Sequence, residues 1–505
     1  MENIFSGLDC ELFKKVLLFD ERNPLLFNSG LFLLLFVGFL LIYQAIRRWK
    51  NVKLIFVILF SLYFYYKSSA EYCFILLGVC VSDYILGRWM GFAKSDWIKR
   101  FIVFLNVGMN VGMLVYFKYF NLLYETFANI TNTSFDALDI ILPAGISFFT
   151  FRSISYIVDI YRGEMKPATN FLEYTFFLSF FPPLLAGPVV RAKDMLPQIK
   201  ANPTATHAMV SEGIFLIIAG LIKKVIIADY ISGNFVDRIF ENPNLYSGFE
   251  NLMGILGFVI QIYCDFSGYS DMAIGIALLL GYRFKDNFDS PFKSQNPTEF
   301  WRRWHISLST WLRDYVYIPL GGNRKGKFRT HLNKMTTMVV GGIWHGASWM
   351  YLIWGAFQGV LLIGHKSISS IYRAPRFLKN NPITIGFNIL ITFTLTAIGF
   401  VFFRFAISKP AIEDSMSSLN MMTHSLIYDF KPEIASQFID AYFLIVVAIA
   451  AGYILHFTPR SWRDAMIENM TKLNPVVQAV ILAIVLFFII QIRQSDLVPF
   501  VYLQY

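Results

Sequence analysis

The chain has 505 residues, of which 56% are hydrophobic and only 15% are charged. Soluble domains usually carry about 25% charged residues, and a soluble protein this apolar would expose large, aggregation-prone patches. A soluble globular protein is therefore excluded, and we expect the chain to lie in a lipid bilayer. The formal net charge of +10 does not indicate a nucleic-acid partner, because excess lysine and arginine on cytoplasmic loops orients membrane proteins.

Long apolar stretches predict membrane-spanning helices, since a hydrocarbon core about 30 Å thick needs roughly 20 apolar residues. Backbone polar groups in lipid must be satisfied within the segment, which favours helix. The stretch 209–230 is the least regular one, because it carries Lys223 and Lys224. In chain order, the clearest stretches are residues 29–46, 52–67, 70–88, 101–124, 209–230, 383–403, 438–457 and 475–492.

The middle of the chain is apolar but interrupted. Prolines and glycines break the stretches 140–158 and 171–190, and carboxylates together with Gly268 interrupt 252–281. Arginines and histidines occur within 300–320, and glycines and a histidine within 336–366. Such segments are tolerated at membrane depth only when protein covers them or a wet cavity adjoins them. We therefore predict an all-α polytopic membrane protein, with about 11–14 helical segments and a central group of short or re-entrant helices. The interrupted stretches are residues 140–158, 171–190, 252–281, 300–320 and 336–366.

Charge predicts the orientation. Residues 281–334 carry many more bases than acids, and a short basic turn lies at 46–53. Both regions are expected on the cytoplasmic side. Residues 408–440 carry more acids than bases, which favours the outer side.

The first polar cluster is Asp265-Phe-Ser-Gly-Tyr-Ser-Asp271. A carboxylate buried in lipid is costly unless it has a partner or meets water. We interpret Asp265, Ser267 and Asp271 as a structural polar core at a helix break that Gly268 permits. Their expected counter-ions are Arg302, Arg303 or Arg313.

The second cluster runs from Glu299 to Tyr315 and contains the sequence FWRRWHISLSTWLRDY. Helical spacing predicts a partly amphipathic helix that enters from the cytoplasmic side. Two interpretations of Arg302, Arg303 and Arg313 stay open: anchoring at the interface, or binding an anionic donor such as the phosphates of coenzyme A.

The third cluster is GGIWHGASW, residues 341–349, with His345 between glycines and tryptophans. A buried imidazole can act as a general base toward a hydroxyl group, although the spacing alone slightly favours a core histidine whose hydrogen bonds are satisfied. Acyl transfer also needs a group that stabilises the oxyanion. The candidates are His305, Asn323, Trp344 and backbone amides near Gly341 and Gly346. No cysteine or histidine spacing is typical of a metal site, so we predict no bound metal.

Together, the runs DFSGYSDMAIGIALLLGYRFKDNFDSPF, FWRRWHISLSTWLRDYVYIPLGGNR and GGIWHGASWMYLIWGAFQG resemble the membrane-bound O-acyltransferases. The resemblance is strongest to the branch that contains the alginate O-acetyltransferase membrane subunit, with the teichoic acid D-alanyl-transfer protein close beside it. It covers about half of the chain, and most strongly residues 255–365.

The resemblance implies a ring of helices around a thinned core with a central tunnel. It also implies one membrane domain over residues 1–505, with N-terminal helices at 1–135, a catalytic core at 136–370 and C-terminal helices at 371–505. His345 corresponds to the essential histidine of the family, and His305 to its second characteristic histidine.

The implied function is transfer of acetyl from cytoplasmic acetyl-CoA, a substrate and not a permanently bound cofactor, across a bacterial inner (cytoplasmic) membrane. The expected acceptor is an extracytoplasmic polysaccharide, or a periplasmic or extracellular partner protein that completes the transfer. Two alternatives stay open: D-alanyl transfer to teichoic acid from a carrier-protein thioester, and, because broken helices with buried acids are also typical of transporters, a transporter of small acyl or sugar substrates.

Overall fold

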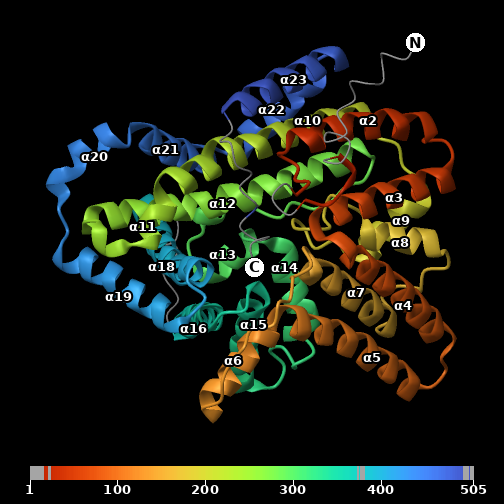
Figure 1. The fold of residues 1–505 in the computed structure, drawn as a ribbon, viewed down its shortest axis with the longest axis horizontal. Helices are drawn as coiled ribbons and strands as arrows, with labels where there is room; N and C mark the ends of the chain where they lie inside the picture. Colours follow the sequence, from red (N-terminus) through yellow and green to blue (C-terminus); the bar gives the residue numbers. More distant parts are fainter. Residues whose placement is uncertain (1–15, 21–23, 372–374, 376–380, 493–499, 501–505) are drawn as a thin grey trace.

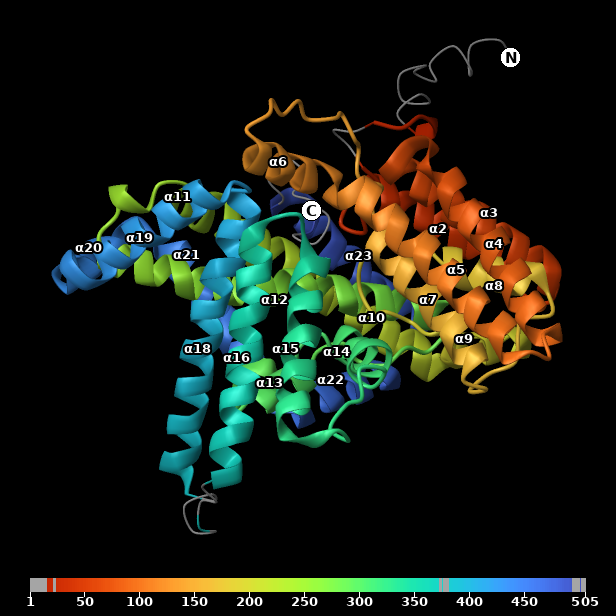
Figure 2. The ribbon, with the colours of Figure 1, turned by 90° about the horizontal axis from the view of Figure 1, so that it is seen from below.

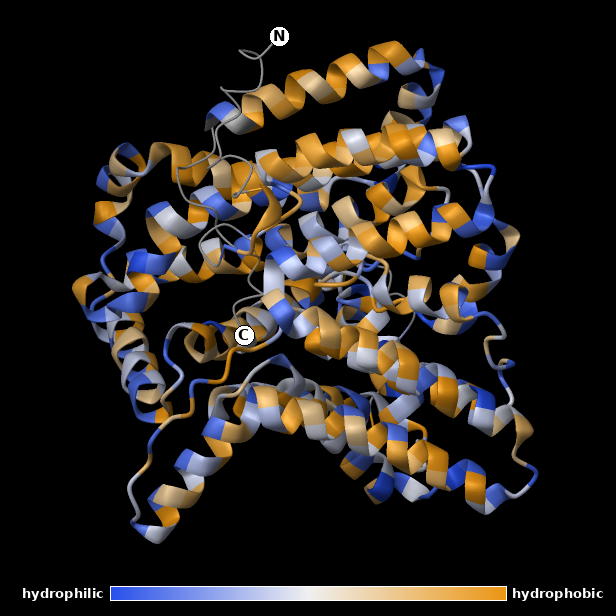
Figure 3. Ribbon diagram, turned by 45° about the vertical axis from the view of Figure 1, so that its right-hand side comes forward, coloured by the Kyte–Doolittle hydropathy of each residue, from blue (hydrophilic) through white to orange (hydrophobic). Residues whose placement is uncertain are grey.

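The computed structural model describes residues 16–20, 24–371, 375, 381–492 and 500, and no strand occurs among them. The prediction of an all-α polytopic membrane protein is confirmed. Four described helical stretches are long and apolar enough to cross a bilayer, and a fifth is bent by 99° between Pro432–Ala441 and Phe443–Phe457. The remaining helices are shorter, more polar or broken, which is why this count is smaller than the number of predicted segments. In Figure 3, hydrophobic residues dominate the long helices and hydrophilic residues gather at the connecting turns.

The N-terminal helices form one side of the molecule, at the right of Figure 1. The π-helical turn η2 joins α5 to α6, so that the predicted stretch 101–124 is one continuous but irregular element. Helices that follow in the chain, from residue 146 to residue 201, pack beside these N-terminal helices in Figure 1. The bounds of the N-terminal helices are α2 (Gly30–Ile46), α3 (Lys50–Ser69), η1 (Ala70–Tyr72), α4 (Cys73–Phe92), α5 (Asp96–Leu114), η2 (Val115–Tyr119) and α6 (Phe120–Thr131).

The central helices follow in the order α7 (Ile146–Tyr161), α8 (Phe171–Ser179), α9 (Ala192–Ala201), α10 (His207–Leu221), η3 (Ile222–Asp229), η4 (Ser232–Val236), α11 (Asp237–Glu241), η5 (Pro243–Leu245), α12 (Gly248–Leu279), η6 (Pro291–Lys293), α13 (Pro297–Arg303), α14 (Ile306–Leu312), η7 (Arg313–Tyr317), α15 (Gly326–His345) and α16 (Trp349–Ile371). The C-terminal helices are α18 (Pro382–Ser408), α19 (Ile412–Tyr428), η8 (Pro432–Ile434), α20 (Ala435–Ala441), α21 (Phe443–Phe457), α22 (Arg460–Lys472) and α23 (Pro475–Ile492).

Basic turns from distant parts of the chain meet at one end of the bundle. Lys50 Nζ donates a hydrogen bond to the carbonyl oxygen of Lys200 in α9 at 3.2 Å. Lys285 pairs with Asp194, which also lies in α9, at 3.6 Å. Arg460 pairs with the neighbouring Asp286 at 3.1 Å. We call this end the basic face. The opposite face carries α6, α11 and α19, as the side view in Figure 2 shows.

The predicted break in residues 252–281 is wrong. Helix α12 is continuous from Gly248 to Leu279. Gly268 serves a different purpose, because a Cβ atom there would lie 2.8 Å from the Gly220 carbonyl oxygen of α10. The missing side chain therefore permits close helix packing, and not a chain reversal.

The single helix predicted for the second cluster, residues 299–315, is also wrong. Helices α13 and α14 are separate, and His305 lies between them with φ +41°. A non-glycine residue rarely adopts this left-handed conformation, and such residues are concentrated at functional sites. The break therefore singles out His305 on structural grounds.

Helices α15 and α16 form an antiparallel hairpin whose packing depends on Gly355. A Cβ atom at Gly355 would lie 2.6 Å from the Met338 carbonyl oxygen of α15. Gly355→Ala is expected to push the two helices apart at a cost of about 1–3 kcal/mol, which a lower thermal unfolding midpoint in detergent would reveal. Gly364 is the matched control on the same helix, since a Cβ atom there meets nothing within 4 Å. Equal midpoints for Gly355→Ala and Gly364→Ala would contradict this account.

Candidate active site

His345 is the last residue of α15, where the chain breaks before Gly346. Its side chain is buried, with 3% exposure. Among the residues that the structure describes, four aromatic side chains pack around it, and we call them the aromatic box. The distances from the ring centroid of His345 are 4.9 Å to Trp344, 6.3 Å to Tyr351, 5.0 Å to Trp354 and 5.1 Å to Phe403.

The aromatic box is assembled from three helices. Trp344 lies in the last turn of α15, Tyr351 and Trp354 lie on the first turns of α16, and Phe403 projects from α18. The rings of Trp354 and Phe403 meet the imidazole nearly edge to face, at 85° and 82°. This packing holds the histidine in one orientation and keeps bulk water from its sides.

His305 is fully buried and is oriented by Asn287. The Nδ1 atom of His305 lies 3.2 Å from the Asn287 Oδ1 atom. The same oxygen accepts a hydrogen bond from the Ser307 hydroxyl at 2.8 Å, and Ser270 binds the amide nitrogen of Asn287 at 3.1 Å. If Nδ1 carries the proton, Nε2 is the basic nitrogen of His305.

Trp344 contacts both histidines. Its ring centroid is 6.1 Å from that of His305 and 4.9 Å from that of His345. Phe151 of α7 stacks on the other side of Trp344 at 5.3 Å. The structure therefore brings together three residues that the sequence singled out, His305, Trp344 and His345.

The same sequence analysis missed Lys118, which reaches the site from η2. Its Nζ atom donates hydrogen bonds to the carbonyl oxygens of Trp344 at 2.8 Å and His345 at 3.0 Å. The available signal was a single lysine within the apolar stretch 101–124, because an ionisable residue at membrane depth is a functional candidate by default. Asn287, in the quoted DNFDSPF run, was missed as well.

The remaining candidates lie away from His345. Asn323 is exposed in a turn whose neighbour Gly322 accepts a hydrogen bond from Asn333 at 2.9 Å. Asn333 is 12 residues before His345 on α15, which corresponds to about 18 Å along the helix axis. The structure therefore does not place Asn323 where it could stabilise an oxyanion beside His345.

The polar core is held together by ion pairs between carboxylates of α12 and lysines of η3. The prediction that arginines of the second cluster neutralise Asp265 and Asp271 is therefore wrong. Lys224 pairs with Asp265 at 2.5 Å and with Asp229 at 2.7 Å, while Lys223 pairs with Asp271 at 2.7 Å. Ser267 is buried beside them. A polar cavity of about 280 Å³ adjoins this core and extends to Asp237 and Arg404, which pair at 2.6 Å.

At the basic face, the three candidate arginines have different surroundings. Arg302 is exposed, and Arg303 pairs with Glu299 at 3.0 Å and Asp289 at 3.3 Å. Arg313 is 60% exposed and pairs with Asp314 at 2.7 Å.

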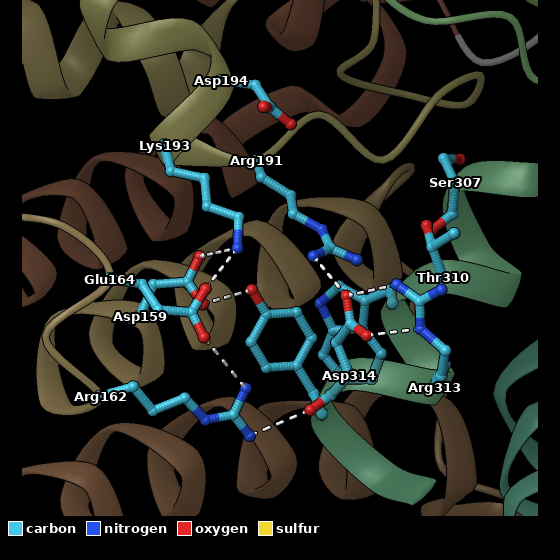
Figure 4. Close-up of polar contacts among 12 residues, drawn as sticks. Asp159, Arg162, Glu164, Arg191, Lys193, Asp194, Ser307, Thr310, Arg313 and Asp314 are labelled. Carbon is cyan, nitrogen blue, oxygen red and sulfur yellow. Dashed lines mark hydrogen bonds and ion pairs between the residues drawn. The ribbon is translucent and has the colours of Figure 1, made fainter. Parts of the chain in front are cut away.

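Arg313 belongs to a charged cluster that joins the end of α7, the start of α9 and η7 (Figure 4). Arg191 also pairs with Asp314 at 2.7 Å, and Lys193 pairs with Asp159 at 3.6 Å. Burial alone would raise the pKa of the Asp314 carboxyl, but hydrogen bonds from Arg313 and Arg191 hold that pKa below its usual range. Asp314 is therefore ionised at neutral pH, and its ion pairs with Arg313 and Arg191 join η7 to the start of α9.

An apolar crevice of about 790 Å³ leads from this cluster toward the aromatic box. Arg162 and Tyr315 line its end at the basic face, and Trp344 and Gly346 line its inner end. A smaller cavity of about 20 Å³ is lined by Lys118, Trp344 and His345, among others. Trp344 therefore lines both spaces, whereas His345 lines the smaller one.

The chain is similar to known membrane proteins. A family model described as MBOAT, the membrane-bound O-acyltransferase family, matches residues 164–407. The chain is 42% identical over 389 residues to the probable alginate O-acetylase of Pseudomonas putida, covering 75% of this chain and 77% of that protein. It is 35% identical over 446 residues to the peptidoglycan O-acetyltransferase of Helicobacter pylori, covering 82% and 83%. It is 30% identical over 272 residues to the teichoic acid D-alanyltransferase of Bacillus subtilis, covering 51% and 68%.

Proposed function

We propose that this chain, which belongs to the membrane-bound O-acyltransferase family, transfers an acetyl group from acetyl-CoA to a hydroxyl group on the far side of the membrane. It is a multi-pass membrane enzyme, and its relatives include O-acetyltransferases. The observation that carries the proposal is His345, held in the aromatic box beside a cavity that Lys118 also lines, while its neighbour Trp344 lines the crevice that reaches the basic face. The membrane we propose is the bacterial inner membrane, with the basic face in the cytoplasm.

In the proposed reaction, His345 acts as the general base. It accepts the proton of an acceptor hydroxyl while that oxygen forms a bond to the thioester carbonyl carbon. The resulting tetrahedral intermediate collapses with cleavage of the carbon–sulfur bond, and the thiolate of coenzyme A recovers the proton from His345. The products are an O-acetyl ester and free coenzyme A. A thioester is already activated, so one well-placed base can suffice.

The donor is proposed to enter from the basic face. The apolar crevice is lined by Arg162 at its outer end and by Trp344 near His345. Exposed guanidinium groups such as that of Arg313 suit the phosphates of coenzyme A, and an apolar passage suits its arm. Acetyl-CoA is a substrate in this scheme, and no permanently bound cofactor is required.

The acceptor is proposed to approach from the opposite face, as a polysaccharide or as a partner protein that passes the acetyl group on. The relatives at 42% and 35% identity are named for acetylation of alginate and of peptidoglycan. The relative named for D-alanyl transfer is less similar and matches a smaller share of this chain. Acetyl is therefore favoured over D-alanyl as the transferred group.

A donor competition tests this function. The purified protein in detergent receives either acetyl-CoA labelled in the acetyl group or a D-alanyl carrier-protein thioester, together with alginate oligosaccharides or peptidoglycan fragments. We expect release of free coenzyme A and label on a carbohydrate from acetyl-CoA alone. Transfer from the D-alanyl thioester alone would contradict the acetyl assignment. Passage of an unmodified substrate through proteoliposomes, with no transfer from either donor, would instead identify a transporter.

A further inference from the structure

Lys118 is tied to the residue that carries the proposed chemistry. Two protons of its ammonium group bind the carbonyl oxygens of Trp344 and His345, the last two residues of α15. These carbonyls have no partner within the helix, because the chain breaks before Gly346. The neighbouring Tyr119 hydroxyl binds the Ile343 carbonyl oxygen at 2.6 Å, so that η2 caps the whole last turn.

The local structure of η2 explains how a lysine reaches this position. Residues Val115–Tyr119 form a π-helical turn within an otherwise α-helical element. Such turns insert an extra residue, redirect the side chains and occur frequently at functional sites. The stretch 101–124 is otherwise apolar, and a lysine at membrane depth is costly unless its charge has a use.

One proton of Lys118 remains after the two carbonyl contacts. A lysine ammonium group has three N–H donors. Among the described residues, the Trp344 and His345 carbonyl oxygens are the acceptors that Lys118 binds. Lys118 and His345 both line the cavity of about 20 Å³, and a space of this size holds about one water molecule or one carbonyl oxygen.

We propose that Lys118 is a further catalytic residue, which donates its third N–H to the carbonyl oxygen of the acyl group during transfer. This inference rests on the proposed function. When the acceptor oxygen bonds to the thioester carbon, the carbonyl π electrons move onto oxygen, and Lys118 stabilises that negative charge without giving up its proton. As the carbon–sulfur bond breaks, the carbonyl re-forms. A fixed positive charge in a water-poor site is well suited to this task.

Three variants separate this role from helix capping. Lys118→Gln keeps N–H donors for the carbonyls without the charge, Lys118→Met removes both, and Lys118→Arg keeps the charge in a larger planar group. We expect kcat to fall about 10²–10³-fold in Lys118→Gln and Lys118→Met, with little change in KM for acetyl-CoA. Lys118→Arg is expected to retain more activity than Lys118→Gln.

Substitution of sulfur for the reacting carbonyl oxygen gives a readout that capping alone does not affect. Sulfur is a weak hydrogen-bond acceptor, so the wild type is expected to lose much of its rate with the dithioester analogue of acetyl-CoA. Lys118→Gln should lose little more, because it has already lost this interaction. An equal loss in both proteins would assign Lys118 to structure alone and overturn the inference.

Lys53 provides the matched control. It is another buried lysine that binds a backbone carbonyl, that of Pro203 at 3.3 Å, near the basic face. Lys53→Met is expected to lower stability while leaving kcat per folded molecule unchanged. A wild type that uses no thioester donor would refute the proposed function itself. An active wild type with equally active Lys118→Gln and Lys118→Met variants would refute only the role of Lys118.

Discussion

His345→Ala is expected to reduce acetyl transfer by about 10³-fold or more, which places it among the largest effects of any single substitution in this chain. The substitution removes the proposed base and leaves the aromatic box without its central ring. The other buried histidine of the site, His305, packs against the same Trp344 ring, but its Nδ1 atom is held by Asn287. His305 therefore does not occupy the same position and is not expected to replace the lost base. Release of free coenzyme A from acetyl-CoA measures the effect.

The control for this experiment is His345→Gln, which retains a polar side chain of similar length without a basic nitrogen. We expect it to be as inactive as His345→Ala while matching the wild type in size-exclusion profile and thermal midpoint. His365 offers a second control, because its Nδ1 atom binds Thr298 at 2.9 Å outside the aromatic box. His365→Gln should remain active. A His345→Gln protein with more than a tenth of the wild-type rate would refute the role of His345 as base.

The sequence predicted the parts of the site that depend on local pattern. Glycines around His345 indicated a helix break, and the break occurs at Gly346. Helical length and apolar composition likewise predicted α2, α18 and α23 to within a few residues. In these cases the cost of unsatisfied backbone groups in lipid determines the structure, and composition alone reveals it.

The partners of each residue could not be predicted in the same way. Phe403 reaches His345 from a helix 58 positions later in the chain, and Lys118 reaches it from 227 positions earlier. Periodicity indicates which face of a helix is buried but not which helix covers that face. The same limit explains the wrong counter-ions of Asp265 and Asp271. The expected counter-ions were the arginines of the second polar cluster, whereas the lysines of η3 make the ion pairs in the structure.

The conformation of His305 was missed for a different reason. Residues 299–315 have a helical pattern of aromatic and polar side chains, which predicts one helix. The Asn287 side chain and the backbone contact from Ile306 N to the Asn287 carbonyl oxygen, at 2.9 Å, hold the chain in the left-handed turn instead. A tertiary contact therefore overrides the local pattern, and it does so at a histidine beside the site.

Lys224→Met is expected to cause the largest loss of stability in the polar core. Lys224 is buried and pairs with both Asp265 and Asp229, so its removal takes one cation away from two carboxylates of the polar core. Breaking a buried ion pair by removing one partner typically costs about 3–5 kcal/mol. We expect a thermal midpoint several degrees below that of the wild type, together with a lower yield of folded protein from membranes.

A double-mutant cycle distinguishes pairing from packing. In the Lys224→Met background, Asp265→Asn removes the charge of one of the two carboxylates that Lys224 pairs with in the wild type. The double variant should therefore be more stable than Lys224→Met alone. Lys223→Met is the matched control, because Lys223 adjoins Lys224 in η3 but pairs with Asp271, whose side chain is 19% exposed, compared with 2% for Asp265. Water can solvate the Asp271 carboxylate more readily, so this loss should be smaller. Additive effects of Lys224→Met and Asp265→Asn would show that the buried pair does not hold η3 against α12, and that close packing at Gly220 and Gly268 carries this contact instead.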